Sequence, residues 1–176
     1  MGASLQGFES STLRIMNKIL DDRQSARAVA YGPDGKVAIL HVKDRNYHKL
    51  PGGGIEEGED EMKGLKRELT EEVGEVEILE SKYLGKLKIV VEKWGINLFS
   101  DCYKVKISKP ISGPTFTKDE YDFYLEWYPL EEAIEKVKND KTDDYGGKIF
   151  QVRDLFILTH QEGWEGTKVF GAPPEN

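Results

Sequence analysis

Four glutamates lie on one face of a short segment, GLKRELTEEVGE, whose sequence favours a helix. In helical geometry Glu68, Glu71, Glu72 and Glu75 occupy positions i, i+3, i+4 and i+7. Like charges at such spacings cost about 0.2–0.5 kcal/mol per pair, and these charges lie toward the negative end of the helix dipole. A divalent cation shared by the carboxylates removes this repulsion, and Mg²⁺ prefers such oxygen ligands. The segment therefore predicts a magnesium site.

Three successive glycines precede the predicted helix, which should span residues 60–73. In the run LPGGG, glycine lets the backbone come close to the carboxylates, so that carbonyl oxygens can join the ligand set. The apolar stripe of the helix falls on a different side from the glutamates. Its members are Met62, Leu65, Leu69 and Val73. We therefore expect one side of the helix to dock on a sheet while the glutamates face a cleft.

Together these residues resemble the Nudix box of the Nudix hydrolases. Gly53 is followed after five residues by Glu59 and after seven more by RELTEEVG, which begins at Arg67. One position departs from the family pattern, because Glu75 stands where an apolar residue is usual. The resemblance extends over roughly residues 26–137. A long motif with two fixed gaps is far more specific than a single short glycine motif.

The resemblance implies a role for each carboxylate. Glu71 and Glu72 would hold the metal, helped by Glu68 and by the carbonyl of Gly52. Alternatively, Glu68 orients or deprotonates the attacking water, because members of the family differ in which carboxylate acts as the general base. The implied cofactor is Mg²⁺, with Mn²⁺ as a substitute. The implied catalytic set is Glu68, Glu71, Glu72 and Arg67.

The resemblance also implies residues that hold the loop in place. Arg67 would pair with Glu59 and fix the loop against the helix. Gly53 and Gly74, which open and close the motif, complete this structural set.

Two further predictions concern residues outside the motif. The family usually takes another acidic ligand from a later loop, where TKDEYD offers Asp119 and Glu120. We favour Glu120, and Glu126 on the next strand is the competitor. For substrate binding we expect Tyr47 and Lys49, just before the glycines. The simpler interpretation is that Tyr47 covers the sheet and Lys49 is solvated.

The remaining segments alternate between strand and helix patterns. They fit one domain over residues 1–176, for which the resemblance implies a Nudix-like fold, an α/β/α sandwich with a mixed central β-sheet flanked by helices. The tail GAPPEN is expected to be irregular. The other expected elements are an amphipathic helix over about 10–22, a hairpin over 26–42, strands between 77 and 107, a strand near 121–130, a helix opened by Pro129 and a helical extension over about 140–164.

Composition narrows the possible partners. With 25 Lys and Arg against 32 Asp and Glu, the net charge is −7, which disfavours nucleic acid and anionic membrane surfaces as partners. The single cysteine, Cys102, excludes an internal disulfide and fits a cytoplasmic location. No stretch is apolar enough to cross a bilayer. A homodimer is left open.

The expected function is Mg²⁺-dependent hydrolysis of a diphosphate linkage in a nucleoside diphosphate derivative, with a (d)NTP or related nucleotide as the default substrate. Alternatives are a hydrolase of ADP-ribose or dinucleoside polyphosphates, and a catalytically silent Nudix-like nucleotide-binding or sensor domain. The intact set of Glu68, Glu71 and Glu72 argues against the silent domain.

Overall fold

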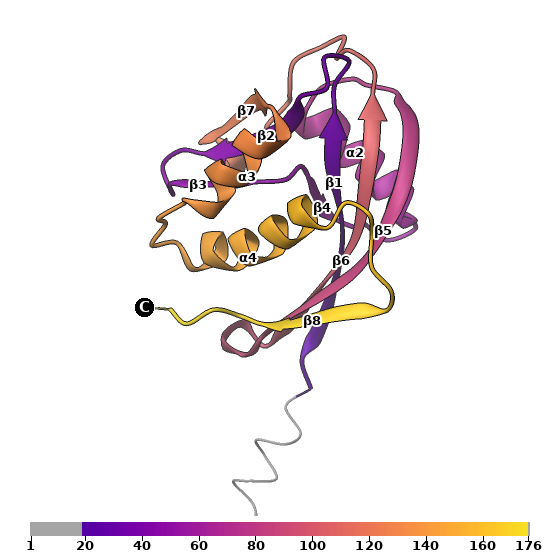
Figure 1. Cartoon of the computed structure of the whole chain (residues 1–176). Coiled ribbons are helices and arrows are strands. Elements are labelled where there is room, and N and C mark those ends of the chain that lie inside the picture. The colour runs from indigo at the N-terminus through magenta and orange to yellow at the C-terminus, as the bar shows by residue number, and fades with distance from the viewer. Residues whose placement is uncertain (1–18, 176) are drawn as a thin grey trace, which may run out of the picture.

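A mixed eight-stranded sheet lies between helices in the computed structural model, which describes residues 19–175. Figure 1 shows α3 and α4 in front of the sheet and α2 behind it, which confirms the expected α/β/α sandwich. The elements are β1 (Asp21–Tyr31), β2 (Val37–Val42), β3 (Tyr47–Lys49), β4 (Gly52–Gly54), α2 (Glu61–Glu72), β5 (Ile78–Val91), η1 (Glu92–Trp94), β6 (Ile96–Ile107), η2 (Lys118–Glu120), β7 (Phe123–Tyr128), α3 (Leu130–Lys138), α4 (Tyr145–Thr159) and β8 (Thr167–Gly171).

The strand order is β3-β2-β1-β6-β5-β8, with β4 paired to β1 and β7 paired to β2. The pairs β1–β6 and β5–β8 are parallel, whereas the other pairs are antiparallel. The predicted hairpin is confirmed as β1 and β2, although β1 begins five residues before the expected start at Ala26. The glycine run therefore lies beside the central strand of the sheet, where the motif helix also packs.

Side-chain alternation along β1 divides it between two cores. On one face, Ala26, Ala28 and Ala30 pack with α2 residues such as Leu65 and Leu69. On the other face, Val29 packs with residues of α3 and α4. Small side chains on the first face let α2 come close to the strand, and this close approach positions the motif glutamates beside β4.

Near both ends of the described chain, the secondary structure differs from the sequence expectations. Most of the helix expected over residues 10–22 lies outside the described residues, but Asp21 and Asp22 begin β1, where they pair with β6. The extension expected over 140–164 is helical only across α4. Residues 167–171 then form β8 in parallel with β5, so Gly171 of the tail is in a strand. Across residues 19–175, no helix is both long and apolar enough to cross a membrane.

Candidate active site

The glycine run forms β4, which fits closely against β1 and α2. Gly52 has a φ of +132°, and a Cβ there would stand 2.1 Å from the carbonyl oxygen of Ala26. A Cβ on Gly53 would stand 2.3 Å from Oε1 of Glu68. Gly52 therefore requires glycine for its backbone conformation and its close approach to β1, whereas a side chain at Gly53 would displace the Glu68 carboxylate.

Helix α2 is defined by a cap, an apolar stripe and a terminating glycine. The side chain of Asp60 accepts a hydrogen bond from the Lys63 amide at 2.8 Å and caps the N-terminus. Leu65 and Leu69 are fully buried against the sheet. Gly74 has a φ of +121°, and a Cβ there would meet a carbonyl of a following loop at 2.1 Å. These constraints fix where the helix ends and which side its glutamates occupy.

Arg67 ties the loop before α2 to the helix. Its Nε and Nη2 donate to the two Glu59 oxygens at 2.8 and 3.0 Å, and this is the ion pair that the resemblance implies. Nη2 also donates to the Gly54 carbonyl at 2.8 Å, while Nη1 donates to Glu68 Oε1 at 2.8 Å. The guanidinium lowers the pKa of Glu59 to about 2, with help from the Glu56 amide. One side chain thus orients the glycine loop, Glu59 and Glu68 together.

Glu72 is nearly fully buried, with only 1 % of its surface exposed. Its Oε2 accepts a hydrogen bond from the Gly52 amide at 2.7 Å, and its Oε1 lies 3.4 Å from Lys49 Nζ. Arg27 donates to the carbonyl of the same Gly52. Burial raises the pKa of Glu72, whereas the charges of Lys49 and Arg27 act in the opposite direction. The buried cations therefore offset part of the cost of placing a carboxylate here.

The sequence analysis missed the buried charges behind Glu72. Arg27 is 8 % exposed, and burial together with the charge of Arg153 lowers its pKa to about 10. Asp154 is fully buried, accepts from the Leu50 amide at 2.9 Å and binds Arg153 Nε at 2.6 Å. A signal was present, because Arg27 interrupts the apolar run ARAVA and Arg153 lies four residues before Ile157 on the buried stripe of α4.

Glu71 lies nearer the surface, beside the loop that follows β6. Burial raises the pKa of Glu71, and the charges of Glu68 and Glu120 add to this effect. The Thr115 amide donates to the Glu71 carbonyl at 2.7 Å, which docks the loop on α2. The Glu120 side chain accepts from the Thr117 amide at 2.9 Å. Glu120 thus lies close enough for its charge to raise the pKa of Glu71.

Two of the sequence candidates lie elsewhere. The Glu126 carboxylate is 3.2 Å from His41 Nδ1 and 3.7 Å from His48 Nε2, so the competitor of Glu120 belongs to a different cluster. Tyr47 is 1 % exposed, and its ring packs against Phe150 of α4. The structure thus places the Tyr47 ring under α4, and a contact with substrate stays a prediction. Lys49, the other substrate candidate, lies against Glu72.

The motif carboxylates fit a hard divalent cation in chemistry, since Glu68, Glu71, Glu72 and the Gly52 carbonyl are all oxygen donors. Their oxygens are paired with Arg67, with Lys49 and with the Gly52 amide. Within residues 19–175, these glutamates do not form a group whose donor atoms all lie within 4.8 Å of one another. Ligation would therefore draw carboxylates away from their present cationic partners.

Comparison with known proteins agrees with this fold and motif. The family model described as NUDIX domain matches residues 21–150. A MutT protein from Bacillus halodurans superposes with a TM-score of 0.60 at 19 % identity, covering 85 % of this chain and 89 % of that chain. A MutT NUDIX hydrolase from Burkholderia pseudomallei gives 0.57 at 16 % identity, covering 80 % and 98 %. At these identities the likeness concerns the fold. No curated protein sequence matches the chain significantly.

Proposed function

The chain belongs to the NUDIX family and is a Nudix-type pyrophosphohydrolase, and we propose that it hydrolyses a (d)NTP or a related nucleotide with Mg²⁺ as cofactor. We reach this substrate class by elimination, because no segment of the sequence marks another specificity. A proline shortly after the motif would favour ADP-ribose, but the next proline here is Pro110. The solved structures named MutT share the fold and are consistent with this proposal.

The observation that carries the proposal is the environment of Glu72. A carboxylate with 1 % of its surface exposed, whose burial raises its pKa, is costly to keep in a fold and is typical of functional sites. Its neighbours are a glycine-loop amide and two buried cations, Lys49 and Arg27. The amide and the two cations stabilise the negative charge of Glu72 in a place where bulk water does not reach it.

We assign metal ligation to Glu71 and Glu72, with Glu68 and the Gly52 carbonyl as further donors. Glu120 is the proposed additional ligand, because the loop that leads to it docks on α2, where the Thr115 amide donates to the Glu71 carbonyl. When bound, Mg²⁺ would neutralise phosphate charge and lower the pKa of a bound water. The chain's own contribution is to hold these oxygens in place.

Arg67 and Lys49 have positioning roles in this proposal. Arg67 holds Glu68 on one side and the Gly54 carbonyl on the other, so it sets the distance between the loop and the helix. Lys49 acts on Glu72 in place of the substrate contact expected from the sequence. The Glu68 carboxylate lies beside Gly53. From there it would orient or deprotonate the attacking water, or serve as a metal ligand.

A nucleotide panel with product analysis tests the proposal. With Mg²⁺ present, we expect the wild-type chain to release phosphate or pyrophosphate from at least one (d)NTP. The Glu72→Gln variant should lose about a thousandfold or more in kcat/KM, since metal-assisted charge stabilisation is worth several kcal/mol. Glu75→Gln, an exposed neighbour, is the matched control and should stay within about twofold of the wild type.

Two results would overturn the proposal. One is the absence of hydrolysis of every (d)NTP in the panel while ADP-ribose or a dinucleoside polyphosphate is cleaved, which would refute the substrate class. The other is full activity in Glu72→Gln, which would refute the site.

A further inference from the structure

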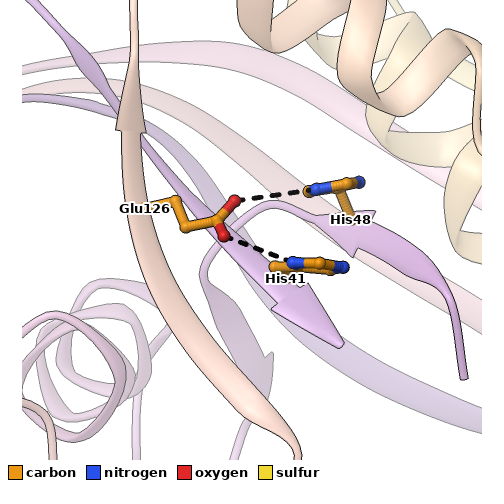
Figure 2. A group of neighbouring side chains, drawn as sticks. All are labelled: His41, His48 and Glu126. Carbon is orange, nitrogen blue, oxygen red and sulfur yellow. Dashed lines mark hydrogen bonds and ion pairs between the residues drawn. The ribbon is translucent and has the colours of Figure 1, made fainter. Parts of the chain in front are cut away.

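A second group of potential ligands lies away from the motif, on three neighbouring strands. His41 of β2, His48 of β3 and Glu126 of β7 place one donor atom each within 4.8 Å of the others. Figure 2 shows the two imidazole rings stacked, with one carboxylate oxygen directed to each. The ring centroids are 4.3 Å apart, His41 Nδ1 lies 3.2 Å from Glu126, and His48 Nε2 lies 3.7 Å from it.

The orientation of His48 is fixed by a further carboxylate. Its Nδ1 lies 2.8 Å from Asp140 Oδ1, and its backbone amide donates to Asp140 Oδ2 at 2.6 Å. Because a carboxylate only accepts, Nδ1 carries the ring proton. In the neutral ring, Nε2 then presents a lone pair toward Glu126. A carboxylate behind the distal ring nitrogen is the usual support of a metal-binding histidine.

Glu126 is held from its other side as well. The Tyr128 hydroxyl donates to Glu126 Oε2, the oxygen that faces His48. The lone pair of His48 and the charge of Glu126 thus face each other across 3.7 Å, and two acceptors in this position need a cation or a proton between them. The cluster is partly shielded, since the side chains of His41, His48 and Glu126 are 24, 12 and 30 % exposed.

The cluster is separate from the motif glutamates. Successive residues of a strand point to opposite faces, so His48 and Lys49 lie on opposite faces of β3. Lys49 reaches Glu72, whereas His48 contacts Asp140 in the segment after α3. A ligand bound at His48 would therefore lie on the opposite face of β3 from the Glu72 site.

The cluster also has a route to solvent with a suitable charge. A pocket of about 340 Å³ is lined by His48, Asn139 and Asp140 and, from α3, by Glu132, Glu135 and Lys136, so that three carboxylates outweigh one ammonium group. An acidic pocket raises the local concentration of cations. Cations therefore have an accessible path to His48.

We propose that His41, His48 and Glu126 form a binding site for a divalent first-row transition ion, with Zn²⁺ as the best match. Two imidazoles and one carboxylate are a common three-residue zinc set, and they leave a fourth position open. Imidazole nitrogen disfavours Mg²⁺ as the occupant, because Mg²⁺ selects oxygen ligands. Asp140 and Tyr128 act as the outer supports of the site. The proposal is independent of the proposed hydrolysis.

Titration of chelator-treated protein with Zn²⁺, in excess Mg²⁺ to occupy oxygen-only sites, tests this proposal by calorimetry. We expect one ion per chain. His48→Gln and His41→Gln should each weaken binding more than a hundredfold, and Asp140→Asn should weaken it about 10–100-fold. His160→Gln is the matched control, since the third histidine ends α4 outside the cluster, and its affinity should match the wild type.

A measurement on the wild-type chain keeps the test decisive if a variant fails to fold. Nitrogen chemical shifts of the imidazole rings should change on addition of Zn²⁺ for His41 Nδ1 and His48 Nε2, whereas both His160 nitrogens should stay unchanged. The proposal is overturned if Zn²⁺ at one equivalent leaves the His41 and His48 rings unaffected. It is equally overturned if uptake persists at full affinity when both histidines are replaced, because the cluster would then be an ion-paired group only.

Discussion

Gly53 shows how one missing side chain can control a carboxylate. Since an added Cβ would stand 2.3 Å from Glu68 Oε1, Gly53→Ala forces the Glu68 carboxylate to move. The clash is with the end of a side chain, so we expect little change in the midpoint of thermal unfolding. We predict that kcat/KM for the hydrolysed nucleotide falls about 10–100-fold, the cost typical of displacing a residue that supports a metal site.

Gly54 provides the matched control for this substitution. A Cβ there would have its nearest neighbour at 3.9 Å, in ordinary contact range. Gly54→Ala should therefore retain nearly all activity. Equal activity in both alanine variants would show that the approach of Gly53 to Glu68 has no functional consequence.

At the scale of elements, the pair Arg67–Glu59 joins the loop before α2 to the helix. The pKa of Glu59 is about 2 in the folded chain and near 4.5 when unfolded. The folded state thus binds this proton less readily, so the pair contributes stability above pH 4.5 that is lost as the pH falls toward 2. Glu59→Gln should therefore show a shallower loss of stability over this range, measured by urea unfolding at several pH values.

Glu56 provides the control for this pH dependence. It lies 3.8 Å from Arg67 Nε but is 68 % exposed at its side chain. Glu56→Gln should follow the wild-type curve, because exposed pairs contribute little. If Glu59→Gln also loses stability in parallel with the wild type, the ion pair does not stabilise the loop.

Elements with local signals were predictable from the sequence, and elements formed by distant pairing were not. Helix α2 carries its cap at Asp60, its apolar stripe and its terminating Gly74 within one short segment, and the prediction was close. Strand β8 depends on parallel pairing with β5, about 80 residues earlier, which no local pattern encodes. The burial of Tyr47 was unpredictable for a related reason, because the helix that covers it comes about a hundred residues later.

At the scale of the whole molecule, buried charges connect α4 with β1 and the glycine loop, which lie about a hundred residues or more before it. Asp154 of α4 holds the Leu50 amide and Arg153, close to Arg27 of β1. Removing Asp154 leaves a buried cation and an amide without their partner. We predict that Asp154→Ala lowers the free energy of unfolding by about 3–5 kcal/mol, measured by urea titration.

Asp143, an exposed aspartate just before α4, is the control for that loss. Asp143→Ala should change the free energy of unfolding by no more than about 0.5 kcal/mol. Similar values for the two variants would mean that Asp154 does not link α4 to the glycine loop.

The most direct measurement is calorimetric titration of the chain with Mg²⁺ in the presence of a non-hydrolysable nucleotide. We predict saturable binding by the wild type and by Glu75→Gln, and loss of that binding in Glu72→Gln. Absence of Mg²⁺ binding by the wild type, or unchanged binding in Glu72→Gln, would contradict the assignment of the divalent cation to the carboxylates of α2.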